Sequence, residues 1–497
     1  MVEFDSDLLS IQQARSMVEA AYKAQSVWAK ASQEQVDRVC EAMANAAFAA
    51  SERLGRMASE ETGYGVPEHK KLKNEFASMR VWESIKNIKT VGVVRHDPAA
   101  HVYEIAWPMG VVAALTPSTN PTSTTINKIL ISVKARNGVV VAPHPAAVNC
   151  CVETAKVMAQ AAVQAGGPEG LIHCMSQVSL PGTNELMSHR HTAVILATGG
   201  SPMVRAAHSQ GKPAYGVGPG NVPAYVDRSA DLEKAARYIV ASKAFDYSVI
   251  CATEQAVIAD RPIAARLEQL MKSEGAYFMD EAQTQAMRQT LFRPDGSINT
   301  ASVGRSPQAL AGLAGISVPS SARILVARLQ KVGRDELLSR EKLTTVLGWY
   351  EVDGWEQGCE RAIEMIHFGG RGHSLIIHAT DEKVIMAFGL EKPVFRIGVN
   401  TMGTLGTIGL TTKVMPSMTL GSGGIGGSIT GDNITVYHLF NIKRLAYETV
   451  APPEAAMRPG SVPAGPLFGP NAQQLESLVE DVVQQILRSG QYAKRDA

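Results

Sequence analysis

Between residues 109 and 227, short apolar runs alternate with longer segments of helical pattern. The apolar runs read as strands at 110–115, 138–142, 171–173, 193–197, 214–217 and 224–226. Helical segments lie between most of them, notably 122–134 and 149–164. Because parallel strands need helical connections, this alternation predicts an α/β fold with one largely parallel sheet, covered by helices on both faces.

Polar or glycine-rich loops follow three of these predicted strands, and ligands bind beyond the carboxyl ends of such strands. The loops are 116–121 (Thr-Pro-Ser-Thr-Asn-Pro), 143–145 (Pro-His-Pro) and 198–201 (Thr-Gly-Gly-Ser). The last of them opens a helix, where free backbone N–H groups favour a phosphate. It is not a Gly-x-Gly-x-x-Gly motif, so it predicts an anion site without identifying the ligand.

A second alternating block runs from residue 229 to about 415 and contains Cys251. The segment 229–244 before this cysteine is helical, and we expect Ser229 to cap its start. The apolar run 256–259 after the cysteine has strand character. A cysteine at such a junction can face a cleft, and the alternative is a buried, inert thiol.

The composition excludes several classes of protein. The net charge is +1, so nothing indicates a partner that is nucleic acid or an anionic membrane. No run approaches the roughly 18 apolar residues that span a bilayer, and the start at Met1 lacks a signal peptide pattern. The six cysteines show no metal-type spacing. We therefore expect no metal and a reducing, cytoplasmic compartment in which a thiol can act as a nucleophile.

The C-terminal region changes composition twice. Residues 451–470 are rich in Pro, Gly and Ala, as linkers are. Residues 471–490 predict an amphipathic helix outside the main core. Its apolar stripe consists of Leu475, Leu478, Val479, Val482, Val483, Ile486 and Leu487.

Five motifs, taken in order, resemble those of the CoA-acylating aldehyde dehydrogenases. They are TPSTNPTS at 116–123, ATGG at 197–200, GVGPGNVP at 216–223, VICATEQ at 249–255 and EKL at 341–343. The resemblance covers roughly residues 5–448 and extends to the bifunctional aldehyde–alcohol dehydrogenases and to the propionaldehyde-type enzymes of bacterial microcompartments.

The resemblance implies an aldehyde dehydrogenase-like α/β architecture in three parts. A Rossmann-type cofactor domain is expected at 1–228 and an α/β catalytic domain at 229–417. The return segment 418–450, together with the strand at 98–107, is expected to form a small β extension for oligomerisation. A homodimer or a dimer of dimers is the implied assembly.

The same resemblance assigns catalytic roles. Cys251 is expected to attack the aldehyde, NAD(P)+ to accept the hydride, and a thioester to remain on the sulfur. The Asn120 amide and the Cys251 backbone N–H are expected to stabilise the oxyanion. His373 is expected to assist proton transfer. From the residues alone, Asn120 also reads as a turn residue before Pro121, and His373 as a structural histidine.

A cofactor site follows from the resemblance as well. Glu341 is expected to bind the nicotinamide ribose, although on its own it reads as a solvated side chain beside Lys342. His144 stands where hydrolytic relatives often carry a lysine, which leaves NADP open while NAD is favoured. The expected cofactor residues are Thr116, Pro117, Ser118, His144, Thr198, Gly199, Gly200, Gly218, Glu341 and Leu343.

One absence decides the predicted product. Hydrolytic members carry a glutamate in a Glu-Leu-Gly-Gly-Lys motif, and it activates water against the thioester. The matching stretch at 217–221 is Val-Gly-Pro-Gly-Asn, without a carboxylate. A stronger nucleophile is then required, and the thiol of coenzyme A suits. The expected function is NAD-dependent oxidation of a small aldehyde to its acyl-CoA.

Two alternatives to this function stay open: a hydrolytic aldehyde dehydrogenase, and a non-catalytic shell-associated protein that retains the fold. Acetaldehyde, propionaldehyde and amino- or sulfo-substituted aldehydes all fit as substrates. The helix at 471–490 resembles encapsulation peptides, which implies microcompartment shell proteins as partners and the microcompartment lumen as location. Its alternatives are an oligomer contact and a helix folded back on the body.

Overall fold

The computed structural model describes residues 5–453, 456, 477–478, 480–482 and 485. The chain divides into two units, of which the larger comprises Met1–His96 with Tyr103–Leu445 and the smaller Asp97–Val102 with Ala446–Ala497. Most of the predicted linker at 451–470 and of the predicted helix at 471–490 lies outside the described residues. All elements that build the site below belong to the larger unit.

The N-terminal region of the larger unit is helical. Its elements are α1 (Ser6–Trp28), α2 (Gln33–Ala49), α3 (Ser51–Thr62), α4 (Pro67–Glu75), the π-helical turn Phe76–Arg80 and α5 (Val81–Ile85). Ser32 and Gln35 form a capping box at the start of α2, and α3 ends at Gly63 in the left-handed conformation. Pro67 occupies the first turn of α4, where its missing N–H costs no hydrogen bond.

The first sheet has five parallel strands in the order β5-β4-β3-β6-β7. They are β5 (Ile172–Cys174), β4 (Gly138–Pro143), β3 (Val111–Thr116), β6 (Thr192–Thr198) and β7 (Ala214–Val217). In β3, Val111 and Ala113 pack in one core cluster, while Val112 and Ala114 pack in the other. Both faces are therefore buried, as the continuous apolar runs predict.

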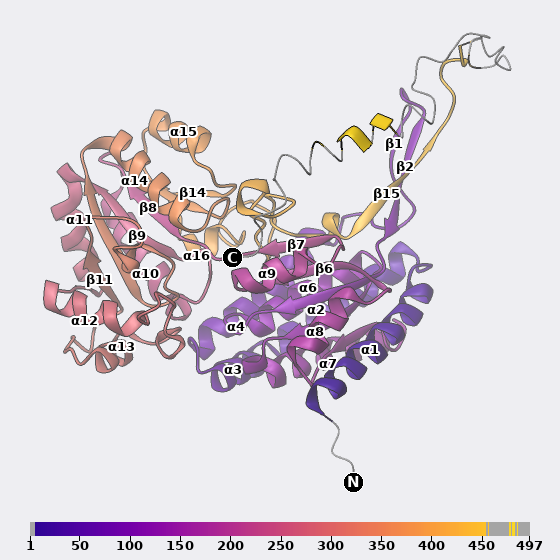
Figure 1. Cartoon of the computed structure of the whole chain (residues 1–497), viewed down its shortest axis with the longest axis horizontal. Coiled ribbons are helices and arrows are strands. Elements are labelled where there is room, and N and C mark those ends of the chain that lie inside the picture. Colours follow the sequence, from indigo (N-terminus) through magenta and orange to yellow (C-terminus); the bar gives the residue numbers. More distant parts are fainter. Residues whose placement is uncertain (1–4, 454–455, 457–476, 479, 483–484, 486–497) are drawn as a thin grey trace. The chain divides into compact units, whose positions relative to one another are not determined.

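Different helices cover the two faces of this sheet (Figure 1). The face of Val111 packs with α1 and with α8 (Leu180–Ser188). The face of Val112 packs with α2, α6 (Pro121–Lys134) and α7 (Val148–Gln164). The predicted α/β class with parallel strands between helices is confirmed.

The second sheet has seven parallel strands in the order β10-β11-β12-β9-β8-β13-β14. They are β10 (Ala276–Phe278), β11 (Ile324–Arg328), β12 (Val346–Val352), β9 (Glu254–Asp260), β8 (Val222–Val226), β13 (Leu375–His378) and β14 (Ile397–Val399). One face packs with α10 (Leu232–Ala244) and α11 (Arg261–Ser273). The other face packs with α12 (Glu281–Leu291), α13 (Pro307–Ala314), α14 (Gly354–Phe368) and α15 (Glu382–Glu391).

Two sequence predictions are wrong in this region. The strand predicted at 224–226 belongs to β8 of the second sheet, not to the first sheet. Only residues 218–221 separate β7 from β8, and a parallel neighbour needs a connection of a dozen or more residues. Ser229 does not cap α10, because Asp231 accepts from the Lys234 N–H at 3.0 Å.

A third sheet has the strand order β1-β2-β15. Its strands are β1 (Val93–Asp97), β2 (Val102–Pro108) and β15 (Phe440–Ala446). Strands β2 and β15 overlap the segments expected to form an oligomerisation extension, whereas β1 lies before them. Among the described residues, no helix combines the length and the apolar character that crossing a membrane requires.

Gly358 in α14 should be needed for packing against the second sheet. A Cβ added there would lie 2.4 Å from Cε2 of Tyr225. We expect Gly358→Ala to lower the free energy of unfolding by about 1–3 kcal/mol through overpacking. Gly389 in α15 has no atom within 4 Å of an added Cβ, so Gly389→Ala should raise stability by about 0.5–1 kcal/mol. Thermal unfolding followed by circular dichroism checks both, and equal shifts would contradict the packing argument.

Candidate functional site

A cavity of about 240 Å³ brings together most of the residues that the sequence singled out. Those that line it are Pro117, Ser118, Asn120, His144, Thr198, Gly199, Gly200, Gly218, Cys251, Glu341 and Leu343. Thr116 and His373 are not among the lining residues. Thr116 is buried at the end of β3, with its hydroxyl 3.6 Å from the Cys151 sulfur.

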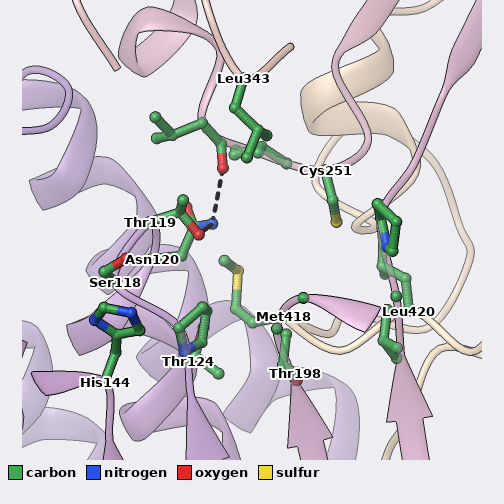
Figure 2. Close-up of a pocket in the computed structure, with 18 of the residues that line it drawn as sticks. Ser118, Thr119, Asn120, Thr124, His144, Thr198, Cys251, Leu343, Met418 and Leu420 are labelled. Carbon is green, nitrogen blue, oxygen red and sulfur yellow. Dashed lines mark hydrogen bonds between the residues drawn. The ribbon is translucent and has the colours of Figure 1, made fainter. Parts of the chain in front are cut away.

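Cys251 occupies the loop between α10 and β9, as predicted for a helix-to-strand junction. All six cysteines lie in the described part of the chain; five are buried and Cys251 alone is partly exposed. Its sulfur points into the open space between Asn120, Met418 and Leu420 (Figure 2). This placement excludes the alternative of an inert thiol packed away from any cavity.

The backbone before Cys251 adopts a conformation that side chains rarely tolerate. Asp246, Tyr247 and Ser248 have φ values of 48°, 48° and 68°. Each non-glycine residue in this region costs on the order of 1 kcal/mol or more, and it persists only where neighbours hold it. Asp246 is the most strongly held: its Oδ1 accepts from the Val66 N–H at 2.7 Å, and its own N–H donates to His69 Nδ1 at 2.8 Å.

The electrostatic surroundings keep the Cys251 sulfur protonated in the free protein. Burial raises the pKa of the thiol to about 12, and the Glu341 carboxylate contributes in the same direction. The Arg396 guanidinium opposes the shift. Since the thiolate is the nucleophile, the sulfur must lose its proton within the cavity before it reacts.

Asn120 lies at the start of α6 without serving it as a cap. Its Nδ2 donates to the Val249 carbonyl and to Thr119 Oγ1, both at 3.1 Å, and the first bond is drawn in Figure 2. Its Oδ1 accepts from Lys73 Nζ at 2.6 Å. The side chain is thus tied to the loop of Cys251, which disfavours the reading of Asn120 as a simple turn residue.

Glu341 also lines the cavity, and Gly220, which is not a lining residue, contacts it. The Glu341 Oε1 accepts from the Gly220 N–H at 2.9 Å, and burial raises the pKa of this carboxyl to about 7. A Cβ at Gly220 would lie 2.2 Å from the Cys251 carbonyl oxygen and 3.0 Å from His373 Nδ1, whereas Gly218 has free space. The sequence motif drew attention to Gly218, but it is Gly220 that has to be a glycine.

His373 lies behind Gly220 and is buried. Its Nδ1 is 3.1 Å from Ser374 Oγ, and burial, assisted by Arg396, lowers its pKa to about 3. The imidazole is therefore neutral at physiological pH. Arg396 donates to backbone carbonyls, including that of His373 at 2.8 Å and that of Gly431 at 2.7 Å. It therefore holds the loop of His373 next to the loop of Gly431.

The other end of the cavity lies at the start of a helix. Helix α9 (Ser201–His208) begins after Gly200 with no side-chain cap, which leaves backbone donors for an anion. The His144 Nδ1 accepts from the Ala146 N–H at 3.1 Å, and burial lowers its pKa, so this side chain adds no positive charge. Within the described residues, no three His, Cys, Asp or Glu side chains gather as a metal site would require.

Several cavity residues escaped the sequence reasoning. Thr124, Ile408, Met418 and Leu420 line the space but belong to no motif. Lys73 also escaped, because a lysine in a polar helix reads as a solvated side chain. Only the fold brings these residues to Cys251.

Comparisons with known proteins agree with this geometry. The sequence matches the aldehyde dehydrogenase family over residues 7–281. Aldehyde-alcohol dehydrogenase 2 of Entamoeba histolytica is 41% identical over 423 residues, which are 83% of this chain and 49% of that protein. The chain spans about half the length of the first curated relatives it matches.

Two solved structures are similar over nearly their whole length. An acetylating aldehyde dehydrogenase from Geobacillus thermoglucosidasius is 50% identical with a TM-score of 0.90, covering 91% of this chain and 100% of that one. A propionaldehyde dehydrogenase from the fucose utilisation bacterial microcompartment of Clostridium phytofermentans is 28% identical with a TM-score of 0.80, covering 87% and 97%.

The charge of Glu341 should be measurable at Cys251. At pH values below the pKa of the Cys251 thiol, the thiolate fraction rises about tenfold per pH unit. The rate at which iodoacetamide alkylates Cys251 should therefore rise between about pH 7 and pH 10. In Glu341→Gln the negative charge that raises the thiol pKa is gone, and the profile should shift to lower pH. Mass spectrometry locates the label and Cys251→Ala serves as the blank. An unshifted profile would show that Glu341 does not act on the sulfur.

Proposed function

This chain belongs to the aldehyde dehydrogenase family, its relatives include CoA-acylating members, and we propose that it oxidises a small aldehyde to an acyl-CoA with NAD(P)+ as hydride acceptor. The observation that carries the proposal is the wall of the cavity at 217–219. Val217 faces the cavity where hydrolytic members hold a catalytic glutamate. Among the described residues that line the cavity, Glu341 is the one carboxylate, and its Oε1 is bonded to Gly220 N–H.

In the proposed mechanism the Cys251 sulfur attacks the aldehyde carbonyl and forms a thiohemiacetal. The developing oxyanion is stabilised by Asn120 Nδ2 and the Cys251 N–H. Since both hydrogens of Nδ2 are engaged in the free protein, one bond, to Thr119 or to Val249, exchanges for the oxyanion. Such rearrangement between free and reacting forms is common in active sites.

NAD(P)+ supplies the hydride acceptor, and loss of hydride from the thiohemiacetal leaves a thioester on Cys251. The start of α9 would hold its phosphates and Glu341 its ribose hydroxyls. The pKa of Glu341, about 7, leaves this side chain substantially ionised at neutral pH and able to accept two hydroxyl donors. NAD is favoured over NADP, and the neutral His144 places no positive charge for a ribose phosphate.

The acyl group then passes from Cys251 to the thiol of coenzyme A. A thiolate is a better nucleophile than water, and no carboxylate at 217 is available to activate water. The exchange conserves a thioester, while the proton released by coenzyme A replaces the one that Cys251 lost. The acetylating activity in the name of the Geobacillus relative supports this step.

For assembly and location, we propose an oligomer built through the third sheet and a microcompartment address at 471–490. The support is the overlap of 98–107 and 418–450 with β2 and β15, the apolar stripe in the sequence of 471–490, and the microcompartment origin of one similar structure. A microcompartment in the cytoplasm would confine a reactive aldehyde.

Coenzyme A dependence tests the proposed function. Purified protein with propionaldehyde and NAD+ should form NADH quickly only when coenzyme A is present, and Cys251→Ser should abolish turnover while retaining the fold.

Val217→Glu should add CoA-independent release of the free acid, because it places a carboxylate in the cavity wall, whereas Val217→Gln should not. Formation of propionate by the wild type at full rate without coenzyme A would instead establish the hydrolytic alternative.

The location is tested separately by deleting residues 471–490. The truncated enzyme should keep its kcat in solution, since all the residues that line the cavity lie between 117 and 420, but it should lose co-purification with microcompartment shells. Fluorescence microscopy of tagged full-length and truncated chains in shell-forming cells provides the readout. A truncated protein that still enters shells would contradict the proposed targeting role of residues 471–490.

A further inference from the structure

A buried cluster beneath the cavity contains charged groups that the mechanism does not use. Lys70, Lys73 and Asp246 are 2%, 2% and 0% exposed. The Asp246 Oδ2 accepts from Lys70 Nζ at 3.2 Å and from Lys73 Nζ. Burying three ionisable side chains is costly unless each finds partners, so their presence here calls for a role.

Resting on the proposed function, we propose that Lys73 and Asp246 are positioning residues that set which end of the Asn120 amide faces the reacting carbonyl. Lys73 donates to Asn120 Oδ1 at 2.6 Å, and Asp246 anchors Lys73. Neither residue lines the cavity, so both act through Asn120 and the loop of Cys251.

Donor and acceptor chemistry decides which way round the Asn120 amide lies. An asparagine amide has an oxygen and a nitrogen of nearly equal size, and it can lie either way round. An ammonium group has donors only, so it selects the orientation in which Oδ1 faces Lys73. Nδ2 must then face the Val249 carbonyl and the cavity. The reverse orientation would offer an acceptor to the oxyanion, which repels it.

Asp246 links helix α4 to the loop of Cys251. One carboxylate oxygen accepts from the two lysines of α4, and the other accepts from the Val66 N–H at 2.7 Å. Asp246 is also the first of the three left-handed residues that lead to Cys251. At Gly65 (φ 74°), an added Cβ would lie 2.0 Å from Asp246 Oδ1, so the approach of the two segments requires this glycine.

The two partners differ in their charge state: Asp246 is ionised, whereas burial lowers the pKa of Lys73 to about 7 against the opposing effect of Asp246, so the ammonium form predominates below about pH 7. Burial alone would raise the pKa of Asp246, but Lys70 and Lys73 together hold it below its ordinary value. Lys70 also donates to the Thr119 carbonyl at 3.2 Å, next to Asn120. Loss of the Lys73 ammonium therefore leaves Asp246 still paired with Lys70, which makes Lys73 the residue to vary.

The test compares Lys73→Met with Lys73→Gln. The two new side chains are similar in length, but only glutamine has an N–H donor for Asn120 Oδ1. We expect Lys73→Met to lower kcat by about 10- to 100-fold, approaching the roughly 10²–10³-fold loss typical of a missing oxyanion donor, with KM for the aldehyde within about threefold. Lys73→Gln should recover most of the loss, because the Asp246 carboxylate accepts from the glutamine Nε2 and so keeps a donor in the place of the ammonium. In an Asn120→Ala background, Lys73→Met should cost less than about threefold more, because it acts through Asn120.

Lys134→Met is the matched control. Lys134 is also a buried lysine paired with an aspartate, Asp37, and its Nζ donates to the Lys86 carbonyl at 3.1 Å, away from the cavity. It should lower the unfolding temperature without lowering kcat. Equal losses in Lys73→Met and Lys73→Gln, or losses that multiply with Asn120→Ala, would overturn the positioning role.

A second readout separates this inference from the proposed function. Attack of Cys251 on 4-nitrophenyl acetate forms a thioester and expels 4-nitrophenolate through the same oxyanion, without NAD+ or coenzyme A. Lys73→Met should slow the burst of nitrophenolate as much as it lowers kcat, while iodoacetamide, which forms no oxyanion, should label Cys251 at the wild-type rate. A wild type that shows the burst but forms no acyl-CoA would reject the proposed function alone. An unchanged burst in Lys73→Met, or no Cys251-dependent burst in the wild type, would reject the positioning role.

Discussion

The site depends on holding the loop of Cys251 in a conformation that it would not adopt by itself. Three successive left-handed residues, 246–248, together cost several kcal/mol, and a cost of that size is recovered only through specific neighbours. The neighbours are Val66, His69 and the two lysines, all on the segment that opens and forms α4. The position of the Cys251 sulfur is therefore set by a helix near the N-terminus, remote from Cys251 in sequence.

The same segment reaches the far side of the cavity through backbone contacts. The Gly65 N–H donates to the Gly304 carbonyl at 3.0 Å, and the Gly304 N–H donates to the Leu343 carbonyl at 3.0 Å. Leu343 lines the cavity and is itself left-handed, with φ at 50°. Strain on both sides of the cavity is thus carried by one connected set of loops. Such loops on a rigid sheet are where functional groups usually lie.

The sequence predicted the elements better than the links between them. Apolar runs and helical patterns gave the strands and helices correctly, because burial on both faces leaves a continuous hydrophobic signal. Cys251 was found because its junction is local and its motif is distinctive. Lys73 and Gly220 were not found, because their contacts are remote in sequence. Lys73 contacts Asp246, more than a hundred positions away, and Gly220 contacts Cys251, about thirty positions away. Ser229 failed as a cap because its hydroxyl accepts from the N–H groups of Thr380 and Asp381, which no local pattern records.

The crossing between the two sheets shows why fold and site are constrained together. Residues 218–221 are too few to return the chain to the first sheet, so they must carry it to the second. Along the way, the Gly220 N–H binds Glu341, and the Asn221 amide donates to the Ser339 and Met365 carbonyls at 2.9 Å. Gly220 also passes too close to the Cys251 carbonyl for any side chain. This one connection joins the two sheets, binds Glu341 and packs against the backbone of Cys251. A longer or bulkier link would therefore disturb the sheet junction, Glu341 and Cys251 at once. The site can therefore change its chemistry at Val217 and at Gly218, where an added side chain finds space, but not at Gly220.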